Sequence, residues 1–395
     1  MSTETPSINV PQSTTQKITN IFLAQNVATQ TKFIVIIMVV IILVATGMYI
    51  YTKMNYKKAH CGIINNLYSD IGKVSSINLD DAKFKGYLLR DFYIKSAYNC
   101  CAIGKFKNTF VDTCALKQVI RQGVRVLDFQ IFSVDNRPVI AVSSLPCDYN
   151  SSNIEKQCYL IKESYNSVGF ADAMKIIANY AFAGDTCPNP NDPLILHFRI
   201  MSTNKKIYTD MTNILHDIFA SKMLDKKYSY EYNGNNLTSE PIANVVNKVI
   251  ISVDKANPYF EDTPLAELVN ICSNSVFMRA LREKDVKYTP DFTELKDFNK
   301  KNMTLELPNV SSSDKNPSAA LGMKYGCQMV GMCYQNYDAH LEYYETFFGT
   351  AGYAFVLKPE ALRYVPVTIP APKPPDPKLS YANRQYESDY YKFTI

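Results

Sequence analysis

Apolar residues fill one uninterrupted stretch near the N-terminus, FIVIIMVVIILVATGMYIYT at residues 33–52, which Lys32 and Lys53 bound. About 20 apolar residues form a helix long enough to cross a bilayer. A cleaved signal peptide would have a shorter apolar region and would not follow a polar segment. A buried core helix would carry polar residues at helical spacing, and the first part of this stretch has none. The pattern therefore predicts one transmembrane helix.

Beyond this span, short apolar runs alternate with amphipathic patterns. The runs are rich in Val and Ile and are bounded by polar or Pro-containing segments, which is typical of parallel strands. Between them, apolar residues recur at i, i+3 and i+4, which predicts helices. This alternation predicts an α/β fold, either a (β/α)8 barrel or a doubly wound sheet. The predicted strands are 124–132, 137–143, 193–200 and 248–254, and the predicted helices are 113–123, 169–182 and 208–221.

The segments around these patterns complete the predicted organisation. Residues 1–32 form a polar N-terminal segment, residues 53–84 a juxtamembrane linker and residues 85–365 the α/β domain. Residues 366–395 are first Pro-rich and then Tyr-rich. This composition predicts an extended tail that lies on a surface or binds a protein partner.

Composition narrows the class of protein. The hydrophobic fraction of 47% and the charged fraction of 20% are ordinary for a globular protein. The net charge of +5 is spread along the chain without a basic block or an RNA-binding aromatic motif, so we expect no nucleic-acid partner. No Gly-rich phosphate-binding motif follows a predicted strand, which argues against a nucleotide-binding sheet.

Cysteines, sequons and flanking charges give opposing indications of orientation. Ten cysteines and four N-glycosylation sequons favour an oxidising, extracytoplasmic environment. The cysteine spacings match no zinc pattern, and most of these residues are predicted to be buried small hydrophobes. Three lysines follow the span closely and one precedes it, which instead favours a cytosolic C-terminal part. The sequons lie at Asn150, Asn236, Asn302 and Asn309, and the lysines are Lys32 before the span and Lys53, Lys57 and Lys58 after it.

Three motifs resemble the phosphoinositide-specific phospholipase C family. GCQMVGMCYQ (326–335), followed by GYAFVLKPEALR (352–363), is similar to the second catalytic half of that family. ALKQVIRQGVRVLDFQIF resembles its first half, and FADAMKIIANYAF with DPLILHFRI resembles the next helix and strand. The resemblance implies a TIM-type barrel of phospholipase C type over residues 85–365. Its nearest variety is the phospholipase C-like proteins of large DNA viruses, which implies a viral or host intracellular membrane.

The resemblance implies that the catalytic histidines are absent. The family uses one histidine as general base on the inositol hydroxyl and another as general acid for the leaving group. Tyr98 occupies the first position and Val142 the second. A tyrosine with a pKa of about 10 is a poor base near pH 7, and a valine transfers no proton. The sequence therefore leaves enzymatic activity open and favours its loss.

The calcium site that the resemblance implies is also altered. Asn99 keeps the amide ligand, whereas Asp128, Gln130 and Arg199 stand at the other metal-ligand positions. A guanidinium repels calcium, which binds several oxygen ligands. We therefore expect no cofactor, and we predict an ion pair between Asp128 and Arg199 in that place.

The positions of the family's phosphate- and inositol-binding residues are degenerate, and one residual site remains to be considered. His197 lies two residues before Arg199 on one predicted strand, so both side chains face the same way. A buried histidine with satisfied hydrogen bonds is the favoured interpretation, and a residual site of His197 with Lys255 is the alternative. His60 is juxtamembrane, and His216 and His340 lie in predicted surface helices. The degenerate binding positions are Ser252, Asp254, Leu305 and Leu307.

Together these inferences predict a single-pass membrane protein, held in a lipid bilayer by residues 33–52, with a phospholipase C-like barrel that has lost catalysis. Its predicted role is structural or one of interaction at a membrane. One alternative is an active phosphoinositide phosphodiesterase with a remodelled site. Another is a disulfide-bonded viral surface or entry component.

Overall fold

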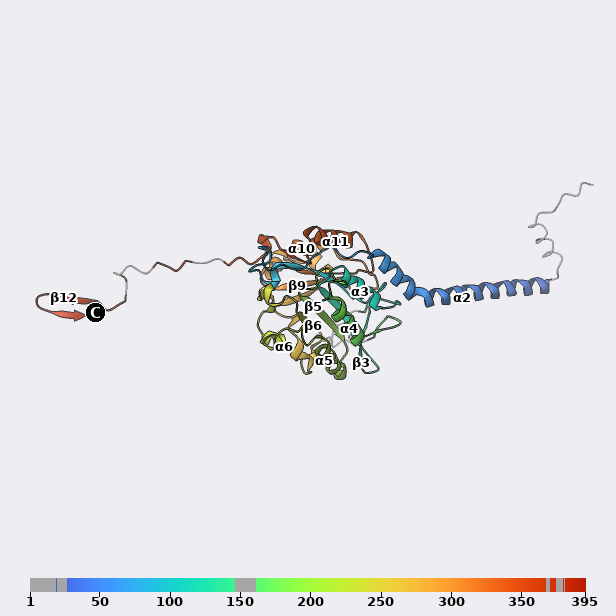
Figure 1. The fold of residues 1–395 in the computed structure, drawn as a ribbon, viewed down its shortest axis with the longest axis horizontal. Coiled ribbons are helices and arrows are strands. Elements are labelled where there is room, and N and C mark those ends of the chain that lie inside the picture. The colour runs from blue at the N-terminus through green and yellow to red at the C-terminus, as the bar shows by residue number, and fades with distance from the viewer. Residues whose placement is uncertain (1–18, 20–26, 146–160, 367–369, 374–378, 380) are drawn as a thin grey trace, which may run out of the picture.

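The computed structural model describes the chain except for residues 1–18, 20–26, 146–160, 367–369, 374–378 and 380. In this part of the chain, parallel strands form a nearly closed eight-stranded barrel with helices on its outside (Figure 1). The strand order is β7-β6-β5-β2-β1-β10-β9-β8, and the barrel opens between β7 and β8. The strands are β1 (Phe92–Ala97), β2 (Val126–Val134), β5 (Leu194–Met201), β6 (Val249–Asp254), β7 (Ile271–Ser273), β8 (Met278–Arg282), β9 (Met303–Leu307) and β10 (Met329–Met332).

The helices connect these strands and cover the barrel. The three sequence-predicted helices are confirmed as α3, α4 and α5, and α3 begins where the Asp112 side chain accepts a hydrogen bond from the backbone N–H of Cys114. Within α6, Tyr230 to Asn233 have φ angles of 52–53°, in the left-handed region. The helices are α3 (Thr113–Arg121), α4 (Phe170–Tyr180), α5 (Lys205–Phe219), α6 (Ser229–Asn233), α7 (Leu265–Leu268), α8 (Glu283–Lys287), α9 (Phe292–Lys301), α10 (Ala319–Lys324) and α11 (Ala339–Ala351). Short 3-10 turns are Leu89–Asp91, Lys226–Tyr228, Leu237–Ser239, Ile242–Asn244, Pro258–Phe260 and Glu360–Leu362.

Three of the four predicted parallel strands are confirmed as β2, β5 and β6, but the one over residues 137–143 is wrong. This segment is β3 (Arg137–Ala141), which pairs with β2 in antiparallel orientation. Only Asp135 and Asn136 separate the two strands, and both have positive φ angles, as a tight hairpin requires. Two residues are too few for a crossover to a parallel neighbour. Two further short strands, β4 (Val168–Gly169) and β11 (Phe355–Leu357), pair with β3 and β1 in antiparallel orientation.

Helix α2 (Val27–Leu67) contains the predicted span and extends beyond it. It is long and apolar enough to cross a membrane, with a mean hydropathy of 3.0 over a window that is 0% buried. A core helix would be buried, so the exposure of this window argues against that alternative. The helix continues through the first part of the predicted linker and leaves the barrel at one side (Figure 1).

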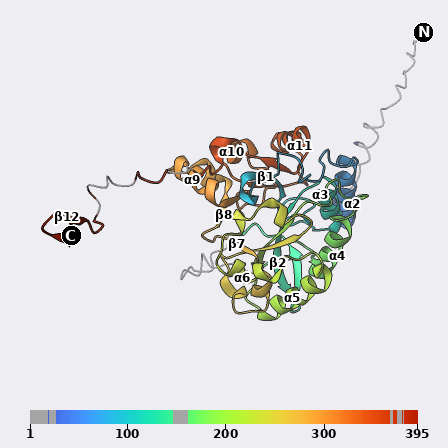
Figure 2. The same cartoon turned by 60° about the vertical axis from the view of Figure 1, so that its left-hand side comes forward.

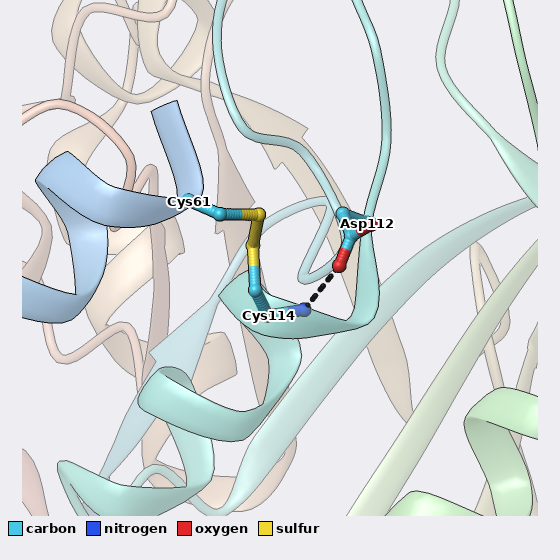
Figure 3. A group of neighbouring side chains, drawn as sticks. All are labelled: Cys61, Asp112 and Cys114. Carbon is cyan, nitrogen blue, oxygen red and sulfur yellow. Dashed lines mark hydrogen bonds between the residues drawn. A yellow bond between two sulfur atoms is a disulfide. The ribbon is translucent and has the colours of Figure 1, made fainter. Parts of the chain in front are cut away.

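The last turns of α2 are fastened to α3. A disulfide joins Cys61 to Cys114, with a Cα–Cα distance of 5.9 Å (Figure 3). The ammonium of Lys57 lies 2.6 Å from the carboxylate of Asp112, the N-cap of α3. Six other described cysteines are buried and free, as predicted for most of them. The disulfide is the exception to that prediction.

The C-terminal region contains a small exposed hairpin. Strands β12 (Gln385–Glu387) and β13 (Lys392–Thr394) pair with each other and with no barrel strand (Figure 1). The rings of Tyr386 and Phe393 stack across the hairpin, with centroids 5.5 Å apart. The predicted extended tail is thus partly folded.

Candidate functional site

Polar side chains converge inside the barrel near the carboxyl ends of β2 and β5. Strand β2 carries Asp128 and Gln130, and strand β5 carries His197 and Arg199. Residues two apart on a strand face the same way. The register places Asp128 beside His197 and Gln130 beside Arg199, so the four residues occupy two successive levels of the barrel interior.

Arg199 and Asp128 form the predicted ion pair. The Nε and Nη2 atoms of Arg199 donate to Oδ1 and Oδ2 of Asp128 at 2.9 and 2.6 Å, which is the two-pronged geometry of a strong guanidinium–carboxylate pair. Both side chains are buried, with 2% and 0% exposed. Burial alone would raise the pKa of Asp128, but the guanidinium and the imidazole of His197 hold that pKa well below its usual range. The carboxylate therefore stays ionised.

Asn99 and Tyr98 enclose the guanidinium from the end of β1. The side-chain Oδ1 of Asn99 accepts a hydrogen bond from Arg199 Nη2 at 2.8 Å, and the backbone N–H of Asn99 donates to Asp128 Oδ2 at 3.1 Å. Asn99 has a φ of 47°, a conformation that Asn tolerates better than most residues. The guanidinium lies over the ring of Tyr98, 4.5 Å from its centroid. Arg199 is thus held on several sides.

His197 is buried with both ring nitrogens engaged, which confirms the favoured interpretation. Its Nδ1 lies 2.7 Å from Oδ1 of Asp128 and its Nε2 lies 2.9 Å from Oγ of Ser273. An ionised carboxylate only accepts, so Nδ1 donates, and in the neutral imidazole Nε2 accepts from the serine hydroxyl. The ring is 0% exposed and does not line the mouth cavity.

The other three histidines lie away from the barrel centre. His60 stacks on Tyr56 in α2, with ring centroids 4.0 Å apart. His216 and His340 are exposed residues of α5 and α11, as predicted for surface helices. None of the three lines the cavity at the barrel mouth.

A cavity of about 210 Å³ opens at the mouth above the ion pair. Gln130 and Asp254 line it, but each is engaged with a neighbour: Gln130 Oε1 accepts from the backbone N–H of Ser143 at 3.0 Å, and Asp254 Oδ1 accepts from Asn274 Nδ2 at 2.7 Å. Arg282 adds a second guanidinium, which donates to the carbonyl of Pro308. The lining includes Tyr98, Gln130, Ser143, Leu145, Arg199, Asp254, Asn257, Asn274, Arg282 and Leu307.

The remaining predicted positions do not reach this cavity. Val142, Ser252 and Leu305 are buried and lie outside its lining, and the hydroxyl of Ser252 has no hydrogen-bond partner. Lys255 is held by the carboxylates of Glu231 and Glu261, both at 2.9 Å. His197 and Lys255 are therefore not brought together in the cavity as a residual site.

The residues at the barrel centre do not fit a calcium ion. Calcium needs several free oxygen ligands. The Arg199 guanidinium occupies both carboxylate oxygens of Asp128 and the amide oxygen of Asn99. Elsewhere in the described residues, Cys61, Asp112 and Cys114 lie close enough to share a metal, but the two sulfurs are joined to each other in a disulfide and offer no thiolate (Figure 3).

Sequence reasoning missed two polar residues of this region. Ser273, which completes the hydrogen bonding of His197, lies on the three-residue strand β7, and no motif marks it. Arg282 lies at the end of β8, a strand that was not predicted. Both belong to the part of the barrel that the three sequence motifs leave uncovered.

Comparisons with known proteins place this fold. No family model and no curated protein sequence matches the chain. Among solved structures, PLC21 from L. pealei has a TM-score of 0.57 at 19% identity, and PLC21 from S. officinalis has a TM-score of 0.54 at 18% identity. Each match covers 73% of this chain and 39% of the other, so this chain spans about two fifths of those proteins. A calcium-dependent phosphoinositol-specific phospholipase C from Pseudomonas matches with a TM-score of 0.42 at 11% identity, covering 70% of this chain and 97% of that one.

The sequence motifs and the structural matches agree on the architecture. The match to PLC21 from L. pealei covers 73% of the chain, and in this chain helix α2 precedes the strands of the barrel. Identity below one fifth supports a statement about the fold alone. The chain has the phospholipase C-type barrel fold that it shares with the two PLC21 structures.

Proposed function

We propose that this chain is a membrane-anchored phospholipase C-like barrel without phosphodiesterase activity, which serves a structural or binding role at the membrane that holds α2. The observation that carries the proposal is the Arg199 guanidinium bound to Asp128 and Asn99 at the barrel centre. In the resembled family, these positions would hold calcium, and a cation of the protein itself fills the space here.

Among the described residues, neither His197 nor the two positions matched to the family's catalytic histidines offers a general base or acid at the mouth. A general base must come within hydrogen-bond reach of the proton that it removes. Both ring nitrogens of His197 are hydrogen-bonded, one to Asp128 and one to Ser273. Val142 is a buried aliphatic residue. Tyr98 is in contact with the Arg199 guanidinium, which it helps to hold in place. These contacts support a stabilising role for residues at the former catalytic positions.

The direct test is turnover by the full chain in lipid vesicles. We expect no release of inositol phosphate from phosphatidylinositol or its bisphosphate above background, with or without calcium. His197→Ala serves as the informative variant, because His197 is the histidine nearest to the mouth. Calcium-dependent release that is lost in His197→Ala would establish an active phosphodiesterase with a remodelled site and overturn the proposal.

The Cys61–Cys114 disulfide favours a second candidate, a surface component on the extracytoplasmic side. Structural disulfides persist in oxidising compartments and are rare in the cytosol. The disulfide therefore favours the orientation opposite to the one that the flanking lysines predict. In this reading the barrel would engage a partner outside the cytosol, and a viral surface or entry role is one form of it.

Counting reactive thiols tests this candidate. In protein denatured without reductant, Cys61→Ser should expose one more thiol than the unmodified chain, because Cys114 loses its partner. The count is read as the mass added by a maleimide reagent, with Cys272→Ser, a buried free cysteine, as the control that loses one thiol. A loss of one thiol in Cys61→Ser would mean that the disulfide does not form in the membrane.

A further inference from the structure

Helix α2 approaches the barrel from the side of its mouth. Lys57 contacts Asp112, and eight residues later Asn65 accepts a hydrogen bond from Gln118 at 3.0 Å. The end of α2 therefore runs parallel to α3, which starts after the loop at the carboxyl end of β1 and leads back to the start of β2. The preceding turns of α2, which contain the apolar span, project beyond the mouth side (Figure 1).

Two loops of the mouth lie against the point where the apolar span ends. Lys53 is the first residue after the span, and its Nζ lies 3.3 Å from the hydroxyl of Tyr165 and 4.9 Å from the centroid of its ring. Tyr165 in turn packs on Phe110, with centroids 5.2 Å apart, and Phe110 packs on Tyr56 of α2 at 5.6 Å. A residue that contacts Lys53 lies at the level of the lipid headgroups when residues 33–52 cross the bilayer.

These loops carry the residue types that suit a membrane surface. We define the membrane rim as Lys105, Lys107, Ile161, Lys162 and Tyr165. Ile161 is 61% exposed and Tyr165 is 50% exposed, although both are large and partly apolar. Tyrosine at the interface places its ring among the lipids and its hydroxyl in water.

The charge of the rim is positive. Lys105, Lys107 and Lys162 lie on it, and Lys53 of α2 lies next to it. Among the described residues of the two loops, Glu163 opposes this charge: it pairs with Lys107 at 3.3 Å and accepts hydrogen bonds from Ser144. Lysines close to a bilayer are attracted by anionic lipids.

The disulfide and the ion pair fix this arrangement. Because Cys61 is bonded to Cys114 and Lys57 is paired with Asp112, the end of α2 cannot rotate away from α3 without breaking them. A barrel on a loose tether would turn freely above the membrane. Here the disulfide and the ion pair hold the barrel so that one defined edge of the mouth faces the bilayer.

We propose that the membrane rim rests on the surface of the bilayer that holds α2 and binds anionic lipid headgroups. The inference relies on the membrane anchoring in the proposed function, and it assigns to particular loops of the barrel a lipid contact of their own. The membrane rim adjoins the end of the apolar span and carries an excess of lysine. Both features favour a lipid surface, rather than a protein, as the partner that covers it.

The chain contains no tryptophan, so a single introduced tryptophan reports its own depth. The full-length variant Tyr165→Trp is reconstituted in phosphatidylcholine vesicles containing lipids brominated close to the headgroup. Phe292→Trp is the matched control, since Phe292 is 54% exposed on α9, on the opposite side of the barrel from α2 (Figure 2). Leu43→Trp, within the span, reports whether α2 is inserted, by quenching from lipids brominated near the chain ends.

We expect brominated lipid to reduce the fluorescence of Tyr165→Trp about twofold, as for an interfacial aromatic residue, and to leave Phe292→Trp unchanged. If Leu43→Trp is quenched while Tyr165→Trp behaves like Phe292→Trp, the anchoring holds and the membrane rim is wrong. If Leu43→Trp is not quenched, the anchoring and the rim both fail.

A second arm tests the headgroup chemistry. Adding phosphatidylserine should deepen the quenching of Tyr165→Trp, and the added Lys105→Glu and Lys162→Glu substitutions should abolish that gain. Lys284→Glu with Lys287→Glu on α8 is the control for the same change of net charge. Equal quenching with and without phosphatidylserine would overturn binding of anionic headgroups. Another outcome would also contradict the proposal: quenching that is lost when a protein fraction is added but kept when anionic lipid is removed. It would mean that a protein occupies the membrane rim.

Discussion

Two buried carboxylates in this barrel have opposite surroundings. Asp128, inside the barrel, receives hydrogen bonds from Arg199, His197 and the backbone of Asn99. Glu306, on β9 and packed against Gly322 of α10, is also 0% exposed, but neither of its carboxylate oxygens has a hydrogen-bond partner. The same chemical group is fully satisfied in one place and isolated in the other.

The difference appears in their ionisation. The neighbours of Asp128 hold its pKa well below the usual range despite burial. Burial, together with the nearby carboxylate of Glu283, raises the pKa of Glu306 to about 8. The barrel centre is therefore built around a permanent charge, whereas the α8–α10 side contains an acid that is neutral at pH 7.

Removing the guanidinium should have the largest effect. Arg199→Ala leaves Asp128 ionised and buried, and we expect a loss of about 3 to 5 kcal/mol of unfolding free energy, the usual cost of breaking a buried pair. Chemical denaturation in detergent micelles measures it. Asp128→Leu combined with Arg199→Met removes both charges and should recover most of the loss. A double variant as unstable as Arg199→Ala would show that the pair does not act as a unit.

Neutralising Glu306 should stabilise the protein, and only above acidic pH. Glu306→Gln should raise the unfolding free energy at pH 8 by about 3 kcal/mol, because each pKa unit is worth about 1.4 kcal/mol and local opening relieves part of the shift. Gln has nearly the same shape, so packing against Gly322 is kept. The comparison is made by denaturation of both proteins at pH 4 and pH 8.

The direction in which stability changes with pH follows from the pKa of Glu306 in the folded and in the unfolded chain. Below its ordinary value of 4.5, the carboxyl is protonated in both the folded and unfolded chain, so the variant should match the unmodified protein. Between 4.5 and about 8, the unfolded chain ionises while the folded one does not, and stability falls as pH rises. A gain of equal size at pH 4 and pH 8 would mean that Glu306 is not an isolated acid.

The ring of Tyr98, which lies over the Arg199 guanidinium, should contribute less to the unfolding free energy than the ion pair does. Tyr98→Leu removes the contact between the ring and Arg199, and we expect a loss of about 1 to 2 kcal/mol, as for a buried cation–π contact. Tyr98→Phe retains the aromatic face and is the matched control, with a small expected change. Equal losses in both variants would assign the effect to the hydroxyl rather than to the ring.

The pair at the barrel centre was predicted from the resemblance to the phospholipase C family, which aligns Asp128 and Arg199 with positions around one metal ion. Asp128 and Arg199 lie on two strands with clear apolar patterns, and their spacing decides which way they face. The resemblance places both residues and Asn99 around one metal position, and in the structure Arg199 binds Asp128 and Asn99 there. The burial of His197 was favoured because a single histidine cannot supply both proton transfers of the family's mechanism. Its partner Ser273 was not foreseen, because β7 is too short to give a pattern.

Features that depend on the packing of distant segments could not be predicted. Glu306 alternates with Leu305 and Leu307 on β9, and nothing in that strand shows that α10 closes over the carboxyl. The pairing of Cys61 with Cys114 requires α2 to continue as a helix past the span and to run along α3. The hairpin of β2 and β3 was the exception, since its two-residue turn was visible in the sequence and was misread as a connection between parallel strands.

We propose that the Arg199 guanidinium occupies the position that calcium would take in the resembled family. The most direct test is the melting temperature of the full chain, followed by tyrosine fluorescence, with excess calcium and with a chelator. A ligand present at about 100 times its dissociation constant adds about 2.7 kcal/mol to stability. We expect identical melting temperatures in the two conditions, and a rise of several degrees with calcium would show that the barrel centre binds the metal.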